Sequence, residues 1–310
     1  MGSLAGQHAL AVAEVDLAAA QSVRLAGLGA GATTQMEIGS LTKALTGLVV
    51  ADSVQRGELR LDAPVDTYLA QLRGSPAGTV TIRDLVTHRS GYAEFGAATL
   101  RRAAWSAPTG RDWIDTTLDQ TMREVRSGDL AGRGAFHYST LGAATAGQAA
   151  AAAAGISYSE LMRTRLFVPL GMSDTAIQAG QPLVRNGRTA SGLSVRPWVM
   201  DGYAPGGPAV STAQDLGVLA TALLNGTPPG MAALTATAGT DQSNTGIGDF
   251  WRVSTWQTGQ TITGHNGQTA GYTSYLDLDR EHRTAVIVLS DVAVDPGTTD
   301  LGIKLLARRK

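Results

Sequence analysis

The sequence predicts an α+β fold in which an antiparallel sheet, built from both ends of the chain and flanked by helices, is interrupted by an inserted helical lobe. Three observations predict it. Apolar and polar residues alternate near the start, over residues 9–28. Helical spacing dominates the middle, and the two-residue period returns from Phe250 onward. This order places residues 1–80 and 208–310 in a sheet lobe and residues 81–207 in a helical lobe, with a cleft between them.

The first elements are three strands and a helix. Alternation predicts strands over residues 9–17 and 22–28, and a third short strand covers residues 35–38. Gly39 then permits a tight turn because it has no Cβ. Ser40 is a favoured residue at a helix start, and apolar residues recur at helical spacing behind it. A helix is therefore expected to run from Ser40 to about residue 55.

The middle of the chain is mostly helical. Its predicted helices begin at Thr81 and cover residues 113–125, 139–155, 159–167 and 211–224. The range 139–155 is rich in alanine, and we expect it to be an ordered helix because alanine is the strongest helix former. Pro169 and Gly171 are expected to end the helix before them. Residues 178–208 contain four prolines and predict loops.

The last part of the chain predicts consecutive antiparallel strands. They cover residues 251–256, 260–263, 271–278 and 284–290, and a helix over 300–309 closes the chain. A tight turn at residues 279–282 joins the last two strands.

Composition excludes several classes of function. The net charge is -1 with no basic stripe, so we expect no nucleic-acid partner. The five histidines show no metal-ligand spacing and there is no cysteine, so we expect no metal and no cofactor. No apolar run is long enough to span a membrane, and the N-terminus does not resemble a secretory signal. The simplest expectation is a cytoplasmic protein without a membrane partner.

Ser40 and Lys43 form the first motif with chemical content. They lie three residues apart, so their side chains share one face of the predicted helix. Serine becomes a nucleophile when a neighbouring base takes its proton, and a buried lysine can lose its charge and act as that base. The helix N-terminus favours a developing oxyanion. The alternative is an N-cap serine followed by a solvated lysine.

Two later segments contain further candidates. Tyr138 precedes the alanine-rich helix and can act as a base if a nearby ammonium favours its phenolate, although packing at a helix entry is the alternative. Residues 264–271 lie between strand-like runs, and their glycines would let a ligand approach a strand edge. The backbone N–H groups of Gln268 and Ser40 can supply two oxyanion donors. For His265 alone, a core or turn histidine is the alternative.

Together these segments resemble the Ser-x-x-Lys, Tyr-x-Asn and Lys/His-x-Gly motifs of the serine β-lactamase and penicillin-binding protein superfamily. Residues 85–92, 167–175 and 205–216 also resemble segments of its class C-like branch. That branch holds class C β-lactamases, D,D-carboxypeptidases, family VIII esterases, D-aminopeptidases and related transacylases. The resemblance covers residues 9–306 and implies a β-lactamase/transpeptidase-like fold.

The resemblance also implies roles for individual residues. Ser40 is the nucleophile that forms an acyl-enzyme. Lys43 and Tyr138 take its proton, pass it to the leaving group and activate the acceptor. The amides of Ser40 and Gln268 form the oxyanion hole, and His265 lines the strand edge against which substrate lies.

Other residues of the same motifs are expected to bind substrate. Gly267 and Asn266 follow His265 in the strand motif. Thr140 stands where the family usually has asparagine, and His265 where class C β-lactamases usually have lysine. Both departures argue against efficient β-lactam hydrolysis. Arg252, thirteen residues before His265, is a candidate for holding a substrate carboxylate, with an exposed strand arginine as the alternative.

Aromatic residues near the expected cleft can line an acyl pocket or belong to the ordinary core. They are Tyr92, Phe95, Trp198 and Tyr272.

These features predict a serine hydrolase or acyltransferase that acts on a small-molecule or peptide ester or amide through acyl-Ser40. The acceptor is water, an amine or an alcohol. The absence of a visible signal favours an esterase, an amidase or a biosynthetic transacylase over a cell-wall enzyme. The alternatives are a D-alanyl-D-alanine carboxypeptidase, a D-aminopeptidase, a weak β-lactamase, or a catalytically silent sensor with the same fold.

Overall fold

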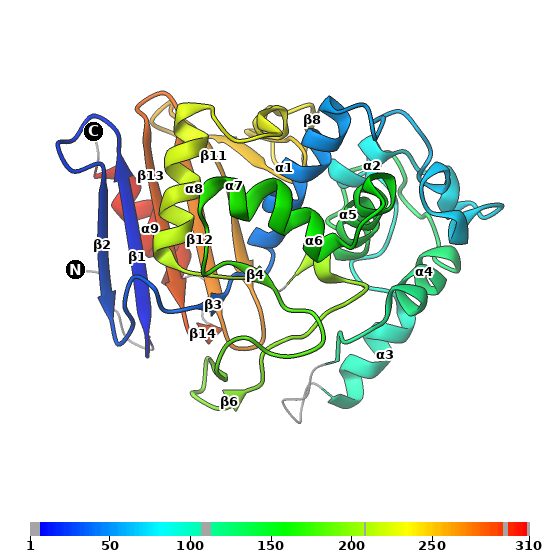
Figure 1. Ribbon diagram of the computed structural model, residues 1–310, viewed down its shortest axis with the longest axis horizontal. Coiled ribbons are helices and arrows are strands. Elements are labelled where there is room, and N and C mark those ends of the chain that lie inside the picture. Colours follow the sequence, from blue (N-terminus) through cyan, green and yellow to red (C-terminus); the bar gives the residue numbers. More distant parts are fainter. Residues whose placement is uncertain (1–6, 107–112, 208, 294–296, 309–310) are drawn as a thin grey trace.

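The computed structural model describes residues 7–106, 113–207, 209–293 and 297–308. It contains an eight-stranded antiparallel sheet beside a helical lobe (Figure 1). The strands of this sheet are Leu10–Asp16 (β1), Val23–Leu28 (β2), Ala238–Gly239 (β8), Thr245–Ile247 (β9), Arg252–Thr255 (β10), Thr261–Gln268 (β11), Thr273–Asp279 (β12) and Thr284–Ser290 (β13). Their order across the sheet is β2-β1-β13-β12-β11-β10-β9-β8.

The two ends of the chain meet inside this sheet. Strand β1 pairs with β13 from Leu10 opposite Ser290 to Asp16 opposite Thr284. The predicted α+β fold, with a sheet assembled from both termini and helices inserted between them, is therefore confirmed.

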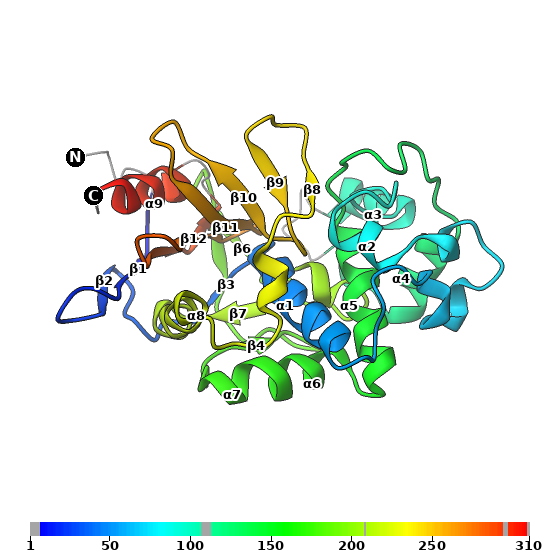
Figure 2. The ribbon, with the colours of Figure 1, turned by 90° about the horizontal axis from the view of Figure 1, so that it is seen from above.

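Helices cover both faces of the sheet, because alternate residues of the central strands are apolar on each side. Helix α9 (Gly297–Ala307) packs on one face, where Leu306 joins a cluster with Leu10 and Val12 (Figure 2). Helices α1 (Leu41–Gln55) and α8 (Ala213–Asn225) pack on the other face. Thr212 caps α8, and Gly226 ends it in the left-handed conformation.

The helical lobe is built around α5. Its helices are Ile82–Val86 (α2), Ala97–Ser106 (α3), Leu118–Arg126 (α4), Thr140–Ala154 (α5), Tyr158–Met162 (α6) and Val168–Leu170 (α7). Thr81 and Asp84 form the expected capping box of α2. Ser139 caps α5. The small alanine side chains of α5 let α1 and the segment around Pro205 approach closely. A Cβ on Gly147 would lie only 2.3 Å from that of Pro205.

Two small sheets join distant parts of the chain. One has the order β3 (Met36–Glu37), β7 (Ala209–Ser211), β4 (Ala176–Ile177), and the other β14 (Val292–Ala293), β5 (Gly187–Thr189), β6 (Ser194–Val195). Strands within residues 81–207 therefore pair with strands that follow this range, β4 with β7 and β5 with β14. The division into 1–80 plus 208–310 and 81–207 stays a prediction.

Strand β11 corrects one expectation. Residues 264–268 lie inside this strand and not between strands. Their glycines oppose strand formation intrinsically, but close packing requires them. A Cβ on Gly267 would lie 2.0 Å from the Ile38 carbonyl oxygen, and one on Gly264 would lie 1.9 Å from the Asp277 carboxylate. Tertiary packing thus overrides the local preference.

Several boundaries also differ from the expected ones. Pro169 does not end its helix: residues 163–167 form a π-helical turn, and α7 continues to Gly171 in the left-handed conformation. Proline in a regular helix removes one i→i−4 bond and clashes with a carbonyl, and the wider turn before it accommodates this loss. Helix α3 and strands β8 and β9 were not expected. Within the described ranges, no helix has the length and apolar character needed to cross a bilayer.

Candidate active site

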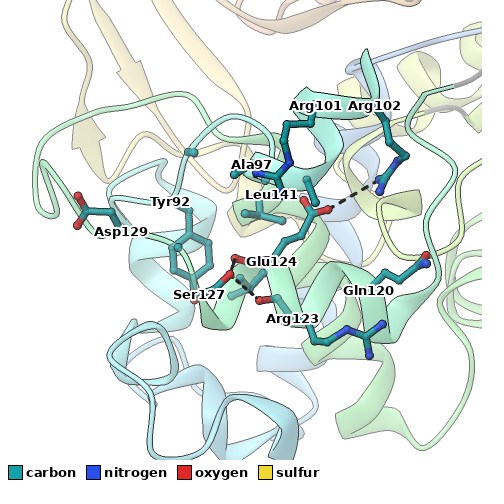
Figure 3. Close-up of a pocket in the computed structure, with 15 residues that line it drawn as sticks. Tyr92, Ala97, Arg101, Arg102, Gln120, Arg123, Glu124, Ser127, Asp129 and Leu141 are labelled. Atoms are coloured by element: carbon teal, nitrogen blue, oxygen red, sulfur yellow. Dashed lines mark hydrogen bonds and ion pairs between the residues drawn. The ribbon is translucent and has the colours of Figure 1, made fainter. Parts of the chain in front are cut away.

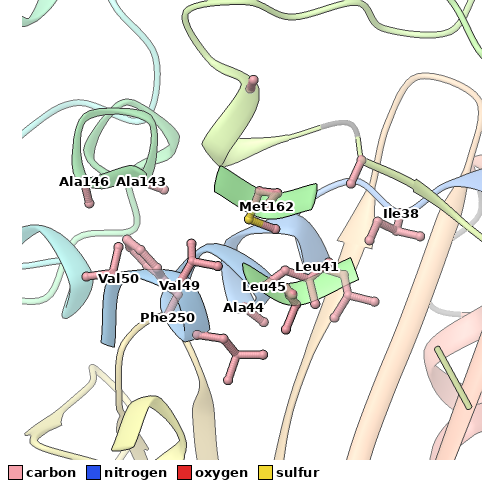
Figure 4. Packing of buried hydrophobic residues seen from close by; sticks show 14 of the residues in the cluster. Ile38, Leu41, Ala44, Leu45, Val49, Val50, Ala143, Ala146, Met162 and Phe250 are labelled. Carbon is pink, nitrogen blue, oxygen red and sulfur yellow. The ribbon is translucent and has the colours of Figure 1, made fainter. Parts of the chain in front are cut away.

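Helix α1 is buried in the core and places the half-buried Ser40 at its N-terminal end. Its residues 41–53 are all buried, because helices, strands and loops surround it on every side (Figure 4). Ser40 occupies the N-cap position with helical dihedral angles, and its side chain makes no capping hydrogen bond. The hydroxyl is therefore available for another partner, which is not the behaviour of an ordinary N-cap serine.

That partner is Lys43. Its side chain is fully buried, and its Nζ donates to Ser40 Oγ at 3.0 Å and to the Gly206 carbonyl oxygen at 2.5 Å. Burial lowers the pKa of Lys43 to about 7, although the negative charge of Glu94 opposes this shift. A large fraction of Lys43 is consequently neutral near pH 7. The alternative of a solvated lysine is wrong.

Tyr138 completes the cluster from the segment that precedes α5. Lys43 Nζ lies 5.0 Å from the centroid of its ring, and its hydroxyl is hydrogen-bonded to Ser40. The rings of His88 and His265 lie 4.7 and 6.4 Å away, centroid to centroid. Burial raises the pKa of Tyr138 above its ordinary value, with the Ser40 hydrogen bond opposing and Glu94 adding to the shift. Burial therefore favours the neutral phenol, and the role of Tyr138 as a base stays a prediction.

Strand β11 brings the expected oxyanion donor to Ser40. Gly39, at φ +51°, permits this contact, because a Cβ there would lie 2.6 Å from the Gln268 nitrogen. The Thr269 N–H donates to the Tyr272 carbonyl oxygen, so these two residues form a hydrogen-bonded pair between β11 and β12. Hydrogen-bonded and non-hydrogen-bonded pairs alternate along an antiparallel ladder, so the next pair, Gln268 and Thr273, is a non-hydrogen-bonded one. The Gln268 N–H therefore points away from β12.

The other edge of β11 is open at this point. Strand β10 pairs with β11 only as far as Gly264. The Gln268 N–H thus faces the Gly39–Ser40 turn and not a neighbouring strand. Two backbone N–H groups near one nucleophile match the expected oxyanion hole.

His265 contributes a neutral ring to the same strand. Its Nδ1 contacts the carbonyl oxygen of Asn266. Burial lowers the pKa of His265 to about 3, and the charge of Lys43 acts in the same direction. The alternation of a strand places Gly267 on the same face as His265, against α1, and Asn266 on the opposite face.

Two pockets lie at the site, one lined by Ser40 itself and the other by Tyr138 and His265. We call the larger, of about 330 Å³, the aromatic pocket, and the smaller, of about 180 Å³, the arginine pocket. The aromatic pocket is lined by Ser40, Glu94, Phe95, Trp113, Thr140, Trp198, Gly206 and Gln268, among others. The arginine pocket is lined by His88, Tyr138, Arg252, His265 and Asn266, among others. The structure therefore brings most of the predicted site residues together around Ser40.

Two predicted aromatic residues lie elsewhere. Tyr92 is buried, donates from its hydroxyl to the Ala77 carbonyl at 2.8 Å, and lines a separate cavity of the helical lobe beside Glu124 (Figure 3). Tyr272 is buried with its hydroxyl on the Arg185 carbonyl. Neither residue lines the two pockets beside Ser40, so both have the core role that the sequence left open.

Arg252 has a strong partner within the sheet. Its guanidinium donates to the Asp277 carboxylate at 3.0 Å, and 35% of its side chain remains exposed in the arginine pocket. Burial raises the pKa of Asp277, and the Arg252 charge opposes that shift. The arginine is therefore neither isolated nor an ordinary exposed strand residue.

Sequence reasoning missed two contributors to the site. The Gly206 carbonyl holds Lys43, the role that the family's asparagine was expected to share, while Thr140 packs its methyl group near Gly206. Glu37 is buried and accepts from Gln178, from the Trp198 N–H and, at 2.7 Å, from the Thr269 hydroxyl beside Gln268. A carboxylate in the short apolar strand before Ser40 was the available signal.

A buried lysine hydrogen-bonded to a serine, beside an open strand edge, is an arrangement in which the lysine can act as the base for a serine nucleophile. The comparisons with known proteins identify the family. The chain belongs to the beta-lactamase family, whose model matches residues 3–307.

Individual relatives agree with this assignment. Esterase EstB of Burkholderia gladioli is 32% identical over 160 residues, which cover 48% of this chain and 40% of the esterase. A beta-lactamase/D-alanine carboxypeptidase structure from Pseudomonas syringae aligns with a TM-score of 0.80 and 16% identity, covering 98% of this chain and 93% of that one. A D-stereospecific amidohydrolase from Streptomyces sp. gives a TM-score of 0.77 and 19% identity, covering 93% and 90%. The two structures establish a shared fold.

Proposed function

We propose that the protein is a serine hydrolase or acyltransferase that acts on an ester or amide through an acyl-Ser40 intermediate. The observation that supports this most directly is the hydrogen bond from buried Lys43 to Ser40 Oγ. An amine whose pKa lies near 7 accepts a proton at neutral pH, which is what a general base for serine requires.

The proposed reaction has two halves. Ser40 Oγ bonds to the substrate carbonyl carbon while its proton moves to Lys43, and the N–H groups of Ser40 and Gln268 stabilise the oxyanion. The bond to the leaving oxygen or nitrogen then breaks, and that atom takes the proton from Lys43 through the Tyr138 hydroxyl. Water, an amine or an alcohol next attacks the acyl carbon, and its proton returns by the same route to Ser40.

The breadth of the family leaves the acyl group and the acceptor as proposals. The esterase and the amidohydrolase similar to this chain support an esterase or amidase. A biosynthetic transacylase would differ only in admitting an amine or alcohol in place of water. A cytoplasmic location stays a prediction.

A D-alanyl-D-alanine carboxypeptidase is the second candidate, because one observation favours it. Arg252 lies in the arginine pocket with Tyr138, where it can meet the carboxylate of a peptide leaving group. Its ion pair with Asp277 already balances part of its charge, which argues for the first candidate. Preferential release of a carboxylate-ended leaving group, lost in Arg252→Ala, would favour the second.

The test is the intact-protein mass after incubation with p-nitrophenyl acetate, for the wild type and Ser40→Ala. We expect an acetyl adduct and p-nitrophenol release with the wild type only. Loss of the adduct with time indicates a hydrolase, and faster loss with an added amine indicates a transacylase. A persistent adduct without turnover would identify the sensor alternative. Equal labelling or turnover in Ser40→Ala would contradict the mechanism.

A further inference from the structure

The carbonyl oxygen that bonds Lys43 has its own support outside the catalytic cluster. Lys43 Nζ donates to the Gly206 carbonyl oxygen, and Gly206 ends a short helical turn over Ala204–Gly206. The Gly206 N–H donates to the Tyr203 carbonyl oxygen at 2.8 Å and so closes this turn. The residues that hold Tyr203 in place therefore also place the acceptor of the lysine.

Tyr203 is fully buried, and its hydroxyl joins two parts of the helical lobe. The hydroxyl accepts from the Gly96 N–H at 2.9 Å and donates to the Glu124 carboxylate at 3.2 Å. Burial raises the pKa of Tyr203, so the hydroxyl keeps its proton for this second bond. One side chain thus ties the turn that bonds Lys43 to helix α4 and to the segment just before α3.

The Glu124 carboxylate is the centre of this support. It is buried on α4, accepts from the Thr99 hydroxyl of α3 at 2.9 Å, and lies 3.8 Å from the Arg102 guanidinium (Figure 3). A Cβ on Gly96 would lie 1.7 Å from its Oε2, so the carboxylate lies directly against the backbone that Tyr203 also contacts. In a buried network of this kind, the loss of one member leaves its partners unpaired.

Helices α1 and α5 hold the other end of the turn. The Thr46 hydroxyl of α1 donates to the Pro205 carbonyl oxygen at 2.7 Å. A Cβ on Gly206 would lie 2.7 Å from Thr140 Cγ2 of α5. Because of these contacts, loss of the Tyr203 hydroxyl should loosen the turn without releasing it from the core.

We propose that Tyr203 is a positioning residue for Lys43. Bonded to Glu124, it fixes the Gly206 carbonyl oxygen where this oxygen keeps the amine against Ser40. Neither Tyr203 nor Glu124 lines the aromatic pocket or the arginine pocket, so both act through the lysine and not on the substrate. The consequence for catalysis rests on the proposed function, whereas the consequence for the amine does not.

The first test follows the protonation of Lys43 directly, by NMR of protein labelled with ¹³C at lysine Cε. The sequence contains three lysines, Lys43, Lys304 and Lys310, and the signal that is absent from Lys43→Met belongs to the first. A carbonyl acceptor favours the ammonium form, so a looser turn should lower the titration midpoint. We expect a wild-type midpoint near pH 7 and a midpoint about 0.5 pH unit lower, or more, in Tyr203→Phe, which changes no charge.

The matched control is Tyr92→Phe. Tyr92 is another buried tyrosine of the helical lobe, and its hydroxyl donates to the Ala77 carbonyl oxygen at 2.8 Å. This variant should also lose a hydrogen bond but leave the Lys43 midpoint unchanged. Glu124→Gln, which keeps Tyr203, serves if Tyr203→Phe does not fold, and should shift the midpoint in the same direction. An unchanged midpoint, or an equal shift in Tyr92→Phe, would overturn the proposal.

The second test measures the acylation of Ser40 by p-nitrophenyl acetate across pH. In Tyr203→Phe the acid limb should move with the NMR midpoint, and the plateau rate should fall about tenfold or more because the amine is no longer aimed at Ser40. A wild-type plateau rate in the folded variant would overturn the proposal. A shifted NMR midpoint together with no acylation of the wild type would contradict the proposed function and leave the positioning of Lys43 standing.

Discussion

Lys43 gives the most quantitative prediction. Burial moves its pKa from 10.5 to about 7, a difference that corresponds to about 5 kcal/mol between the neutral and protonated folded states. The folded-state pKa is the lower one, so between pH 7 and 10.5 the unfolded chain binds more protons than the folded protein. The free energy of unfolding must therefore rise with pH in that window.

The perturbation is Lys43→Met, which keeps a long apolar side chain and removes the titration. Denaturant unfolding at pH 7 and pH 9 should show the wild type gaining about 2 kcal/mol more stability than the variant over these two units. The comparison uses the difference in slope, because the variant also leaves Ser40 and Gly206 without their donor at both pH values. Groups shared by both proteins cancel.

Activity provides a second check on the same group. The neutral amine is the base, so the acylation rate of the wild type should rise with pH, with a midpoint near 7. Parallel stability curves for the two proteins, or an acylation rate that does not change between pH 6 and 8, would refute the assignment of a neutral buried lysine.

Two further predictions concern the supports of the site. Glu37→Gln places an amide N–H₂ group against a donor that now bonds to the carboxylate. The free energy of unfolding should therefore fall by about 2 kcal/mol, and acylation should slow. Unchanged values would mean that the carboxylate does not position the residues beside Gln268. Gly267→Ala puts a Cβ 2.0 Å from the Ile38 carbonyl oxygen, so it should lower the free energy of unfolding by at least about 2 kcal/mol and abolish acylation. The control is Gly239→Ala, whose Cβ meets no atom within 4 Å and should change stability by about 0.5 kcal/mol or less. Similar melting curves for the two glycine variants would contradict the packing argument.

The sequence was sufficient for the parts of the fold that carry strong periodicity. The helix after Ser40, the alanine-rich α5 and strand β13 lie within one or two residues of their expected positions. Each has local signals, such as the cap at Ser139, that agree with its tertiary surroundings. That one sheet unites both ends of the chain could be anticipated because strands occurred at both ends with helices between them.

The remaining features depend on contacts between distant residues. Nothing in the local pattern of Gly264 to Gln268 indicates a strand, because its glycines are required by Ile38 and Asp277 across the structure. The Gly206 carbonyl has no side chain by which a motif could reveal it. The direction of the Tyr138 pKa shift depends on burial, which a motif does not report.

The union of β1 with β13 has a consequence for how the protein is made. The ribosome completes α1, with Ser40 and Lys43, long before it synthesises β11, β12 and β13. Until those strands emerge, the apolar surface of α1 has no sheet to cover it, and pairings across such long separations form late. Apolar surface exposed in this way favours aggregation of the nascent chain until the strands arrive. Because Gln268 lies on β11, the nucleophile gains its oxyanion donor only after this late strand has been synthesised.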